Sequence, residues 1–471
     1  MKLAIIIIGP GYINLFYNLG NYLKSKGIEI IYVLENKYEI YKEGYQELFK
    51  KESVYFLIDF RKKHKNSITK QKREWLPLFS TFDRVTTYGY KTSPGDLEEM
   101  LISDYDMWDY LFKEEKIDGV FNENVSDTIS YVAYLKCLQY KKKYLGLDGS
   151  YFSEKLRIIS DLYGVNEVFQ TFSTYLKKGK KIFDKDLNDL YQKIISPTVF
   201  PDYMKNNPSF VGYSLMNHYL KKLHLIKNYI YYYLKEHKNI KKSFETKGPF
   251  WKAWRLFLRE AKRKARIKIM IAKRYFTEPD YNEKFLIYPL HFHPEASTLI
   301  NAWPYIDELP MIKNIAFSLP DGYKLYVKTH PNGFGYEGIQ FYKKVKAIPR
   351  IKLIHYFINS KELIAKSCGV ITLTSTMGFE ALMLKKPVFI FGNIFYQVHP
   401  YCNKIENIYL LPKILSEGLS KEYNQQLFEK YNLSFLKVYY DCTFSGKFEL
   451  FKRQDPKNIK RIGDEIIKSI S

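Results

Sequence analysis

The chain has 471 residues, of which 46% are apolar and 17% aromatic, and its formal net charge is +24. This length exceeds that of one ordinary hydrophobic core, so we expect two or three domains, and the apolar content excludes a disordered chain. The four cysteines form no CxxC pair, which argues against a zinc site and a disulfide framework and favours a reducing cytosol. The positive charge favours a polyanionic neighbour, such as nucleic acid, an anionic membrane face or an acidic polymer, although a lysine-rich composition alone is the competing explanation.

The N-terminal residues predict a β-α-β unit. Residues 3–8 are an aliphatic run, residues 12–26 have the apolar spacing of a helix, and residues 28–34 are a second apolar run. About six apolar residues precede the Gly9-Pro10-Gly11 turn, too few for a signal peptide or a membrane span. The turn lacks the GxGxxG spacing of dinucleotide-binding folds, so no nicotinamide site is predicted.

Further α/β units are expected up to about residue 200. A strand ends at residues 119–121, and Glu123 follows it before a helix predicted over residues 126–140. The next segment, YLGLDGSYFSEKLR, is interpreted as a glycine-punctuated loop that contains Asp148.

Residues 201–275 are expected to form a basic helical connector. Within residues 251–274 there are ten Lys or Arg residues and one acid, Glu260. On a helical wheel the apolar residues share one face and basic residues share the neighbouring one. This pattern predicts binding to an anionic membrane surface, and the alternative is a packed connector with solvated charges. The apolar face holds Trp254, Leu258, Ala261, Ala265, Ile269 and Ala272, and the basic face holds Lys252, Arg255, Arg259, Lys262 and Arg266.

A second α/β unit is predicted from residue 276 onward. Its apolar runs are short, rich in Val, Ile, Tyr and Phe, and closed by Gly, Pro or Ser, as in buried parallel strands. A helix is expected over residues 377–384, and beyond residue 401 the sequence is mostly helical. The predicted domains are therefore 1–200, the connector 201–275, 276–415 and a helical tail 416–471. The strands are expected at residues 285–288, 324–327, 352–355, 370–373 and 387–391.

The candidate site lies where these strands end. Four of the nine histidines, His291, His293, His330 and His355, lie at the ends of predicted strands within about 65 residues. Ligands bind outside the carboxyl ends of parallel strands, and helix N-termini there hold phosphates. We therefore expect one anionic ligand between the His330-Pro331 pair and the Ser375-Thr376 pair.

Several neighbouring side chains fit the same ligand. Lys328 adds positive charge beside His330, and Glu380, one turn into the predicted helix, can accept hydrogen bonds from both hydroxyls of a ribose. The structural alternatives are that Ser375 and Thr376 only cap the helix and that Glu380 is a surface acid or a partner of the helix dipole. No HxxxH or HExxH spacing occurs, so no metal site is predicted.

Three stretches of this domain resemble a known family. YPLHFHPEAST, KTHPNG and TSTMGFEALMLKKPVFIFGNIFY are similar to the carboxyl-terminal domain of bacterial capsule and surface polysaccharide biosynthesis proteins, the group that includes Kdo transferases. The HP pair followed by a Ser/Thr motif is also similar to bacterial sialyltransferases. The resemblance is clearest over residues 285–400.

The resemblance implies a GT-B glycosyltransferase, with two Rossmann-like domains facing a cleft and a nucleotide-sugar donor, often CMP-linked, bound by the second. His330 matches the histidine that contacts the donor phosphate and is the main catalytic candidate. Ser375 and Thr376 match the hydroxyl motif on that phosphate, and Glu380 matches the acid on the nucleotide-binding helix. Lys328 and His291 complete the expected donor site. Enzymes of this kind typically need no metal or other cofactor.

The first domain is expected to bind the acceptor and to supply a general base or nucleophile. Sialyltransferases carry an acidic motif there that this chain lacks in clean form. Glu123 and Asp148 are the catalytic candidates, and each has a structural alternative.

The resulting hypothesis is a cytoplasmic, metal-independent glycosyltransferase at the inner face of the cytoplasmic membrane. It moves Kdo or another acidic sugar from a CMP donor onto a capsule or other surface glycan or glycolipid. The alternatives are a transferase that uses CDP-glycerol or a similar polyol-phosphate donor and a non-catalytic module that binds polyanions. No nucleic-acid partner is expected, because the basic residues cluster in one helix without a nucleic-acid-binding fold.

Overall fold

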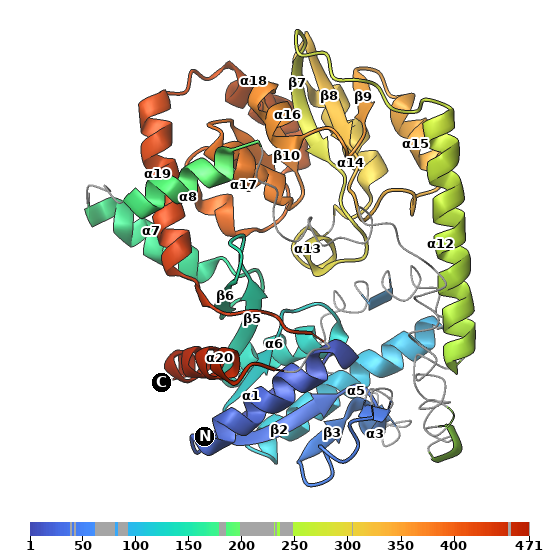
Figure 1. Ribbon diagram of the computed structural model, residues 1–471, viewed down its shortest axis with the longest axis vertical. Coiled ribbons are helices and arrows are strands. Elements are labelled where there is room, and N and C mark those ends of the chain that lie inside the picture. Colours follow the sequence, from blue (N-terminus) through green and yellow to red (C-terminus); the bar gives the residue numbers. More distant parts are fainter. Residues whose placement is uncertain are drawn as a thin grey trace. The chain divides into compact units, whose positions relative to one another are not determined.

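The computed structural model describes residues 1–37, 40–41, 44–61, 81–82, 93–178, 185–197, 230, 233–235, 248–303, 305–450 and 454–470. The chain divides into two compact units (Figure 1). Unit 1 consists of Met1–Leu162, Tyr213–Leu256 and Thr443–Ser471, and unit 2 consists of Tyr163–Gly212 and Phe257–Cys442.

Unit 1 is built on a seven-stranded sheet in the order β3-β2-β1-β4-β5-β6-β13. The strands from β3 to β5 are parallel, whereas β6 and β13 are antiparallel to their neighbours. The C-terminal helix α20 packs beside α1 through Gly463, where an added Cβ would lie 2.3 Å from the Tyr22 ring. The elements are β1 (Lys2–Ile6), η1 (Pro10–Tyr12), α1 (Ile13–Ser25), β2 (Glu29–Leu34), β3 (Val54–Phe56), α3 (Leu57–Arg61), α5 (Pro94–Lys113), β4 (Gly119–Asn122), α6 (Thr128–Tyr140), β5 (Lys143–Gly149), β6 (Lys155–Ile159), β13 (Phe444–Ser445) and α20 (Pro456–Ile470).

One local prediction in unit 1 is wrong. The segment around Asp148 is not a loop but the strand pair β5 and β6. Gly146 lies within β5, where its neighbours leave no room for a side chain. An added Cβ would be 2.7 Å from Ile159 and 3.0 Å from the carbonyl oxygen of Glu123. A glycine that permits close packing inside a strand has the same sequence signature as one that permits a turn.

Unit 2 contains a six-stranded, fully parallel sheet in the order β12-β11-β10-β7-β8-β9. This is the doubly wound order, in which the sheet grows outward in both directions from its first strand. Helix α12 (Gly248–Ala272) lies between α8 and β7 in the chain and begins in unit 1. The other elements of unit 2 are α7 (Asn166–Lys178), α8 (Lys185–Ile195), β7 (Lys284–Pro289), α13 (Ala296–Leu299), α14 (Glu308–Ser318), β8 (Tyr323–Lys328), α15 (Ile339–Lys346), β9 (Ile351–Ile354), α16 (Ser360–Lys366), β10 (Gly369–Thr372), α17 (Thr376–Met383), β11 (Val388–Ile390), η2 (Phe395–Val398), β12 (Cys402–Lys404), η3 (Ile408–Leu410), α18 (Leu411–Ser420) and α19 (Gln425–Asp441).

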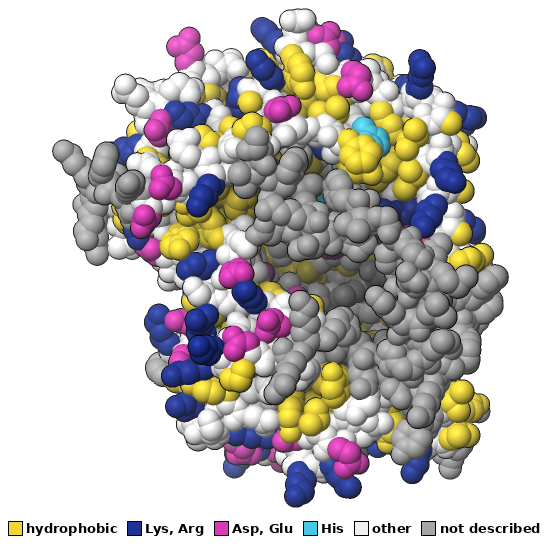
Figure 2. Space-filling model, viewed as in Figure 1, with side chains coloured by type: hydrophobic (Ala, Val, Ile, Leu, Met, Phe, Trp, Pro, Cys, Tyr) yellow, Lys and Arg dark blue, Asp and Glu magenta, His cyan; other side chains and the backbone are white. Residues whose placement is uncertain are grey.

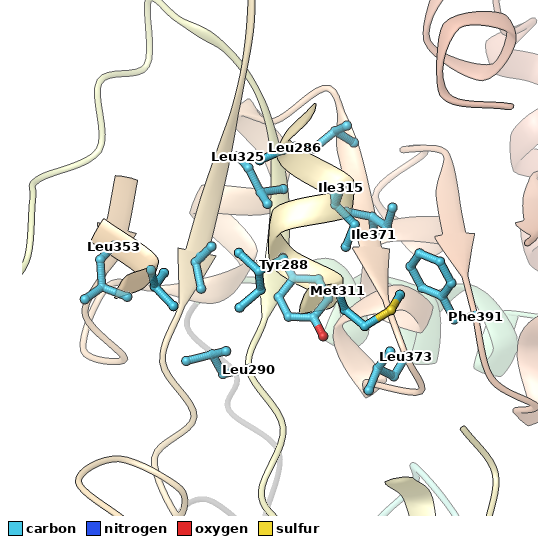
Figure 3. Packing of buried hydrophobic residues seen from close by; sticks show 14 of the residues in the cluster. Leu286, Tyr288, Leu290, Met311, Ile315, Leu325, Leu353, Ile371, Leu373 and Phe391 are labelled. Atoms are coloured by element: carbon cyan, nitrogen blue, oxygen red, sulfur yellow. The ribbon is translucent and has the colours of Figure 1, made fainter. Parts of the chain in front are cut away.

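The core of unit 2 lies between this sheet and α14 (Figure 3). Met311 and Ile315 of α14 lie over Tyr288 of β7 and Ile371 of β10, and all four are at most 5% exposed. Burial of such apolar side chains contributes roughly 1.5–3 kcal/mol each. The core thereby fixes the central strands β7 and β10, whose carboxyl ends carry candidate residues.

The unit boundaries differ from those expected from sequence. Helices α7 and α8, which we assigned to a first domain ending near residue 200, belong to unit 2. They pack there because Tyr191 of α8 donates a hydrogen bond to the carbonyl oxygen of Met383 at 2.7 Å and Phe172 of α7 packs edge-on against Phe435 of α19. The expected tail 416–471 is likewise divided between both units. Most of the expected connector 201–275 lies outside the described residues, which include residues 230 and 233–235, helix α12 and the three residues after it.

The predicted α/β class with two Rossmann-like domains is confirmed, as is the helical C-terminal region. Two short strands in that region, β12 and β13, were not predicted, because segments of two or three residues have no detectable period. Among the helices in the described parts of the chain, none is both long and apolar enough to cross a bilayer.

A buried carboxylic acid lies inside unit 1. Asp104 of α5 is fully buried, and its carboxyl group lies beside the Thr128 hydroxyl without well-formed hydrogen-bond geometry. Burial raises the pKa of Asp104 well above its usual range, and the negative charge of Asp127 adds to this shift. Burial therefore favours the protonated form of Asp104 in the folded protein.

This pKa shift predicts how an Asp104→Asn variant responds to pH. Because the folded state holds a proton that the unfolded state releases, Asp104 destabilises the protein increasingly as pH rises above the ordinary pKa of aspartic acid. Thermal unfolding should give a higher Tm for Asp104→Asn than for the wild type at pH 8, with a smaller difference at pH 5. A difference in Tm that stays constant between these pH values would contradict the assignment.

Candidate functional site

The candidate site lies at the carboxyl edge of the unit 2 sheet. The direction of sheet growth reverses between β7 and β10, and this topological switch point is where doubly wound sheets bind ligands. Three segments meet around it: the β7 loop (residues 290–295), the β8 loop (residues 329–338) and the β10 loop (residues 373–375). Each follows directly from a buried strand, so its first residues are held by the sheet.

His291 joins the loops on either side of the switch point. Its Nδ1 lies 2.9 Å from Glu308, and its Nε2 lies 3.1 Å from the Thr372 hydroxyl and accepts from the backbone N–H of Thr374 at 3.3 Å. A ring nitrogen that accepts from a backbone N–H carries no proton, so Nδ1 is the protonated nitrogen that donates to the Glu308 carboxylate. Both ring nitrogens are therefore occupied, and His291 holds the site together instead of facing a ligand.

Glu308 anchors this arrangement as a buried charge. It is the first residue of α14, where the helix dipole favours a carboxylate, and it accepts from the Tyr288 hydroxyl and the backbone N–H of His291, both at 3.0 Å. Burial alone would raise the pKa of Glu308, but its contacts with His291 and His293 outweigh that effect and lower the pKa to about 2. Glu308 is thus ionised throughout the physiological range.

His330 presents a defined hydrogen-bond donor in the β8 loop. Its Nδ1 accepts from the backbone N–H groups of Asn332 at 3.1 Å and Gly333 at 3.3 Å. Burial lowers the pKa of His330 to about 4, and the nearby His291 adds to the shift, so the ring is neutral with its proton on Nε2. Among the described residues, none forms a hydrogen bond with Nε2, which leaves that N–H available to a ligand.

Ser375 and Thr376 lie at the start of α17, as predicted. Ser375 is the N-cap residue, and its hydroxyl oxygen accepts from the backbone N–H of Met377 at 3.2 Å. The hydroxyl hydrogen of Ser375 has no acceptor within the described parts of the chain. Capping and ligand binding are therefore compatible, because the same hydroxyl can accept from the helix and donate to an anion.

The backbone around Ser375 is held on two sides. Its N–H donates to the Thr372 hydroxyl at 3.1 Å, and its carbonyl oxygen accepts from the Tyr396 hydroxyl at 2.6 Å. Gly378 leaves room for that tyrosine, since a Cβ there would lie 2.3 Å from its hydroxyl oxygen. The N-terminal turn of α17 is consequently positioned before any ligand arrives.

Lys328 and Glu380 are both buried near the edge of the sheet. Lys328 is the last residue of β8 and its Nζ donates to the carbonyl oxygen of Tyr356 at 2.9 Å. Burial lowers the pKa of Lys328 to about 7, against the opposing effect of the negative Glu380. Glu380 is only 5% exposed, so the alternative that it is a surface acid is wrong.

The structure brings the second-domain candidates to one edge of one sheet. Because β7 separates β8 from β10, the backbones that carry His330 and Ser375 are two strand spacings, or about 10 Å, apart where the strands end. The β7 and β8 loops are in contact, since the Cβ position of Gly333 is 3.3 Å from the carbonyl oxygen of His291.

The candidates in unit 1 have different surroundings. Asp148 lies directly opposite Arg157 on β6 and accepts from its Nε at 3.0 Å, which fits the structural alternative for Asp148. Glu123 directly follows β4, at the carboxyl edge where unit 1 has its own switch point between β1 and β4.

Sequence reasoning missed Glu308 and Thr374. Glu308 comes 17 residues after His291 in the chain, and no motif connects them. Thr374 adjoins the Ser-Thr pair and donates to the carbonyl oxygen of Ser297 at 2.7 Å, so the hydroxyl-rich run TSTM was the available signal. Among the described residues, no three His, Cys, Asp or Glu side chains gather as metal ligands would.

The basic face of α12 also differs from its prediction. Arg259 and Arg266, which were expected to face a membrane or solvent, contact the β8 loop instead. Lys252 and Arg255 lie outside the part of α12 whose side chains the structure describes.

Several solved structures of other proteins are similar to the chain. Two Kdo transferase structures of KpsC from Thermosulfurimonas dismutans are similar to the chain. The β-Kdo 2,7 transferase is 12% identical over 81% of this chain and 98% of its own, with a TM-score of 0.36. The β-Kdo 2,4 transferase is 14% identical over 77% and 94%, with a TM-score of 0.35.

A third similar structure is S. aureus MnaA with UDP, at 12% identity over 100% of this chain and 97% of its own, with a TM-score of 0.30. No curated protein matches the chain in sequence. Residues 261–401, which contain every candidate donor-site residue, match the family model of capsule polysaccharide biosynthesis proteins, so the expected resemblance to that family is confirmed over this part of the chain.

Proposed function

We propose that this protein is a glycosyltransferase that moves Kdo or another acidic sugar from a CMP-linked donor onto a capsule or other surface glycan or glycolipid. The main support for this proposal is a pair of hydrogen-bond donors at the switch point of unit 2, the N–H of His330 and the hydroxyl of Ser375, which no described residue accepts from. Two neutral donors and a helix N-terminus form a site suited to one phosphate group.

The proposed chemistry places these donors on the leaving group. As the bond between the sugar and the phosphate breaks, negative charge accumulates on the phosphate oxygens. The neutral imidazole of His330 and the N-terminal turn of α17 stabilise that charge without having to be reorganised, which is the most effective form of electrostatic catalysis. No metal ion or other cofactor is part of this proposal.

The remaining donor-site residues have supporting roles. Glu380 accepts hydrogen bonds from the ribose hydroxyls, and Lys328 supplies positive charge when protonated. Thr376 completes the hydroxyl pair at the start of α17. On the acceptor side, Glu123 is the proposed base, because it lies at the carboxyl edge of the unit 1 sheet.

The acidic substrate class agrees with the charge of the chain. A net charge of +24 attracts an acidic donor, an acidic growing glycan and an anionic membrane. On the face shown in Figure 2, however, Lys and Arg side chains are interspersed with Asp and Glu. Long-range attraction is therefore proposed to raise encounter rates, while the site itself gives specificity.

We further propose that the protein acts in the cytoplasm, at the inner face of the membrane, with α12 as the contact. Leu258, Ala265, Ile269 and Ala272 form an exposed apolar stripe along this helix, and the exposed Lys262 and Lys268 flank it. An apolar stripe bordered by lysines is typical of helices that lie in an anionic membrane surface.

A transferase that uses CDP-glycerol or a related polyol-phosphate donor is the alternative activity, because the same phosphate site would serve it. Incubation with CMP-Kdo, CMP-sialic acid, CDP-glycerol and UDP-sugars distinguishes the two by which donor is consumed. A non-catalytic polyanion-binding module predicts no turnover and no nucleotide-dependent thermal shift.

The first prediction for this site concerns His330. Replacement by alanine removes the proposed donor to the leaving group and should lower turnover of the preferred donor by about 10² or more. Circular dichroism and Tm should stay close to those of the wild type, because His330 bonds only to its own loop. Turnover equal to that of the wild type would remove His330 from the mechanism.

The second prediction concerns α12. A Leu258→Glu/Ile269→Glu variant places charges in the apolar stripe and should reduce sedimentation with phosphatidylglycerol vesicles by about tenfold or more. Phe317→Glu, at an exposed aromatic residue of α14, is the matched control and should bind as the wild type does. Equal binding by all three proteins, or no binding by the wild type at low salt, would contradict the membrane proposal.

A further inference from the structure

The side of α12 that carries Arg263 and Arg266 is hydrogen-bonded to the β8 loop, which carries His330. Arg263 donates from Nε to the carbonyl oxygen of Phe334 at 2.8 Å, and Arg266 donates from Nη1 to that of Tyr336 at 2.7 Å. Longer bonds from the same two arginines reach the carbonyl oxygens of Pro331, Gly335 and Glu337. Five carbonyl groups of one short loop thus point toward two guanidinium groups.

Packing reinforces these hydrogen bonds. The Tyr336 ring lies under the guanidinium groups of Arg259 at 4.2 Å and Arg263 at 4.6 Å, and its hydroxyl donates to Glu260. Both distances are within the range at which a cation is attracted to the face of an aromatic ring. The helix and the loop are therefore held by charge, by aromatic contact and by backbone hydrogen bonds together.

Gly335 allows the helix to approach this closely. Its φ of +85° is in the left-handed region, and an added Cβ would lie 2.8 Å from Ile267 and 3.0 Å from Arg263. Any larger residue would both strain the backbone and push the loop away from α12.

The orientation of the loop determines which nitrogen of His330 carries the proton. The Pro331 carbonyl oxygen, which accepts from Arg263 Nη2 at 3.3 Å, belongs to the same peptide group as the Asn332 N–H, which donates to His330 Nδ1 at 3.1 Å. The next N–H, that of Gly333, donates to the same nitrogen at 3.3 Å. That pair of bonds excludes a proton from Nδ1 and places it on Nε2.

We infer that Arg263 and Arg266 are positioning residues that fix the tautomer of His330 through the backbone of the β8 loop. They touch neither the substrate nor the reacting atoms. Without them the loop would relax, its N–H groups would leave Nδ1, and His330 would divide its proton between both nitrogens. This inference rests on the proposed function only in its consequence for donor turnover, because the tautomer can be observed without substrate.

The test combines NMR with kinetics. The nine histidines are labelled with ¹⁵N, and the resonances of His330 are assigned by their loss in His330→Asn. In the wild type they should show a neutral ring protonated on Nε2 from pH 8 down to about pH 5, because the pKa of His330 is lowered to about 4. In Arg263→Ala/Arg266→Ala they should show mixed tautomers and a pKa nearer 6.5, and turnover should fall about tenfold.

Two further variants keep the test decisive. Gly335→Ala moves the same loop without removing an arginine and should shift the His330 resonances in the same way, even if the double variant folds poorly. Arg350→Ala is the matched control, because Arg350 also donates to a backbone carbonyl, that of Leu319 at 3.0 Å, but precedes β9 at the opposite edge of the sheet. It should leave both His330 and turnover unchanged.

Wild-type His330 resonances in both Arg263→Ala/Arg266→Ala and Gly335→Ala would overturn the inference. If instead the resonances shift as expected but the wild type consumes none of the donors, the positioning role stands and the proposed function fails. The two proposals are therefore separated by one set of samples.

Discussion

The hydrogen bonds of His291 are the constraint on which the site depends. In a doubly wound sheet the two strands beside the switch point are not consecutive in the chain, so no short covalent connection holds their loops together. His291 joins them, with the ionised Glu308 on one nitrogen and the backbone of Thr374 on the other. The cost of burying the Glu308 charge is offset because that carboxylate also accepts from Tyr288 and from the backbone of His291.

Contacts with other elements also hold the loops around the site in place. The β7 and β10 loops are held by the core through their strands, and the β8 loop is held by the arginines of α12. His330 of the β8 loop and Ser375 of the β10 loop each have a hydrogen-bond donor that no described residue uses. Preorganised donors of this kind are what a developing negative charge requires, since they need no rearrangement during the reaction. Several elements of unit 2 therefore hold the one proposed phosphate site in place.

The sequence predicted the fold and the second-domain candidates because both depend on local signals. Short β-branched runs closed by glycine or proline marked β7, β8 and β10, and Ser375 marked the start of α17. Asp148 was misplaced because a glycine inside a strand resembles a glycine in a turn. Glu308 and the arginines of α12 were beyond prediction, since their partners lie 17 to 71 residues away in the chain and only the fold brings them together. The helical wheel did identify both faces of α12, but an isolated helix gives no sign of which face turns inward.

A crystal structure of the protein with CMP is the most direct test of the central claim. The account predicts that the phosphate lies within hydrogen-bond distance of both His330 Nε2 and the Ser375 hydroxyl, in front of the N-terminal turn of α17. A phosphate bound elsewhere, or one that contacts only one of these residues, would contradict it.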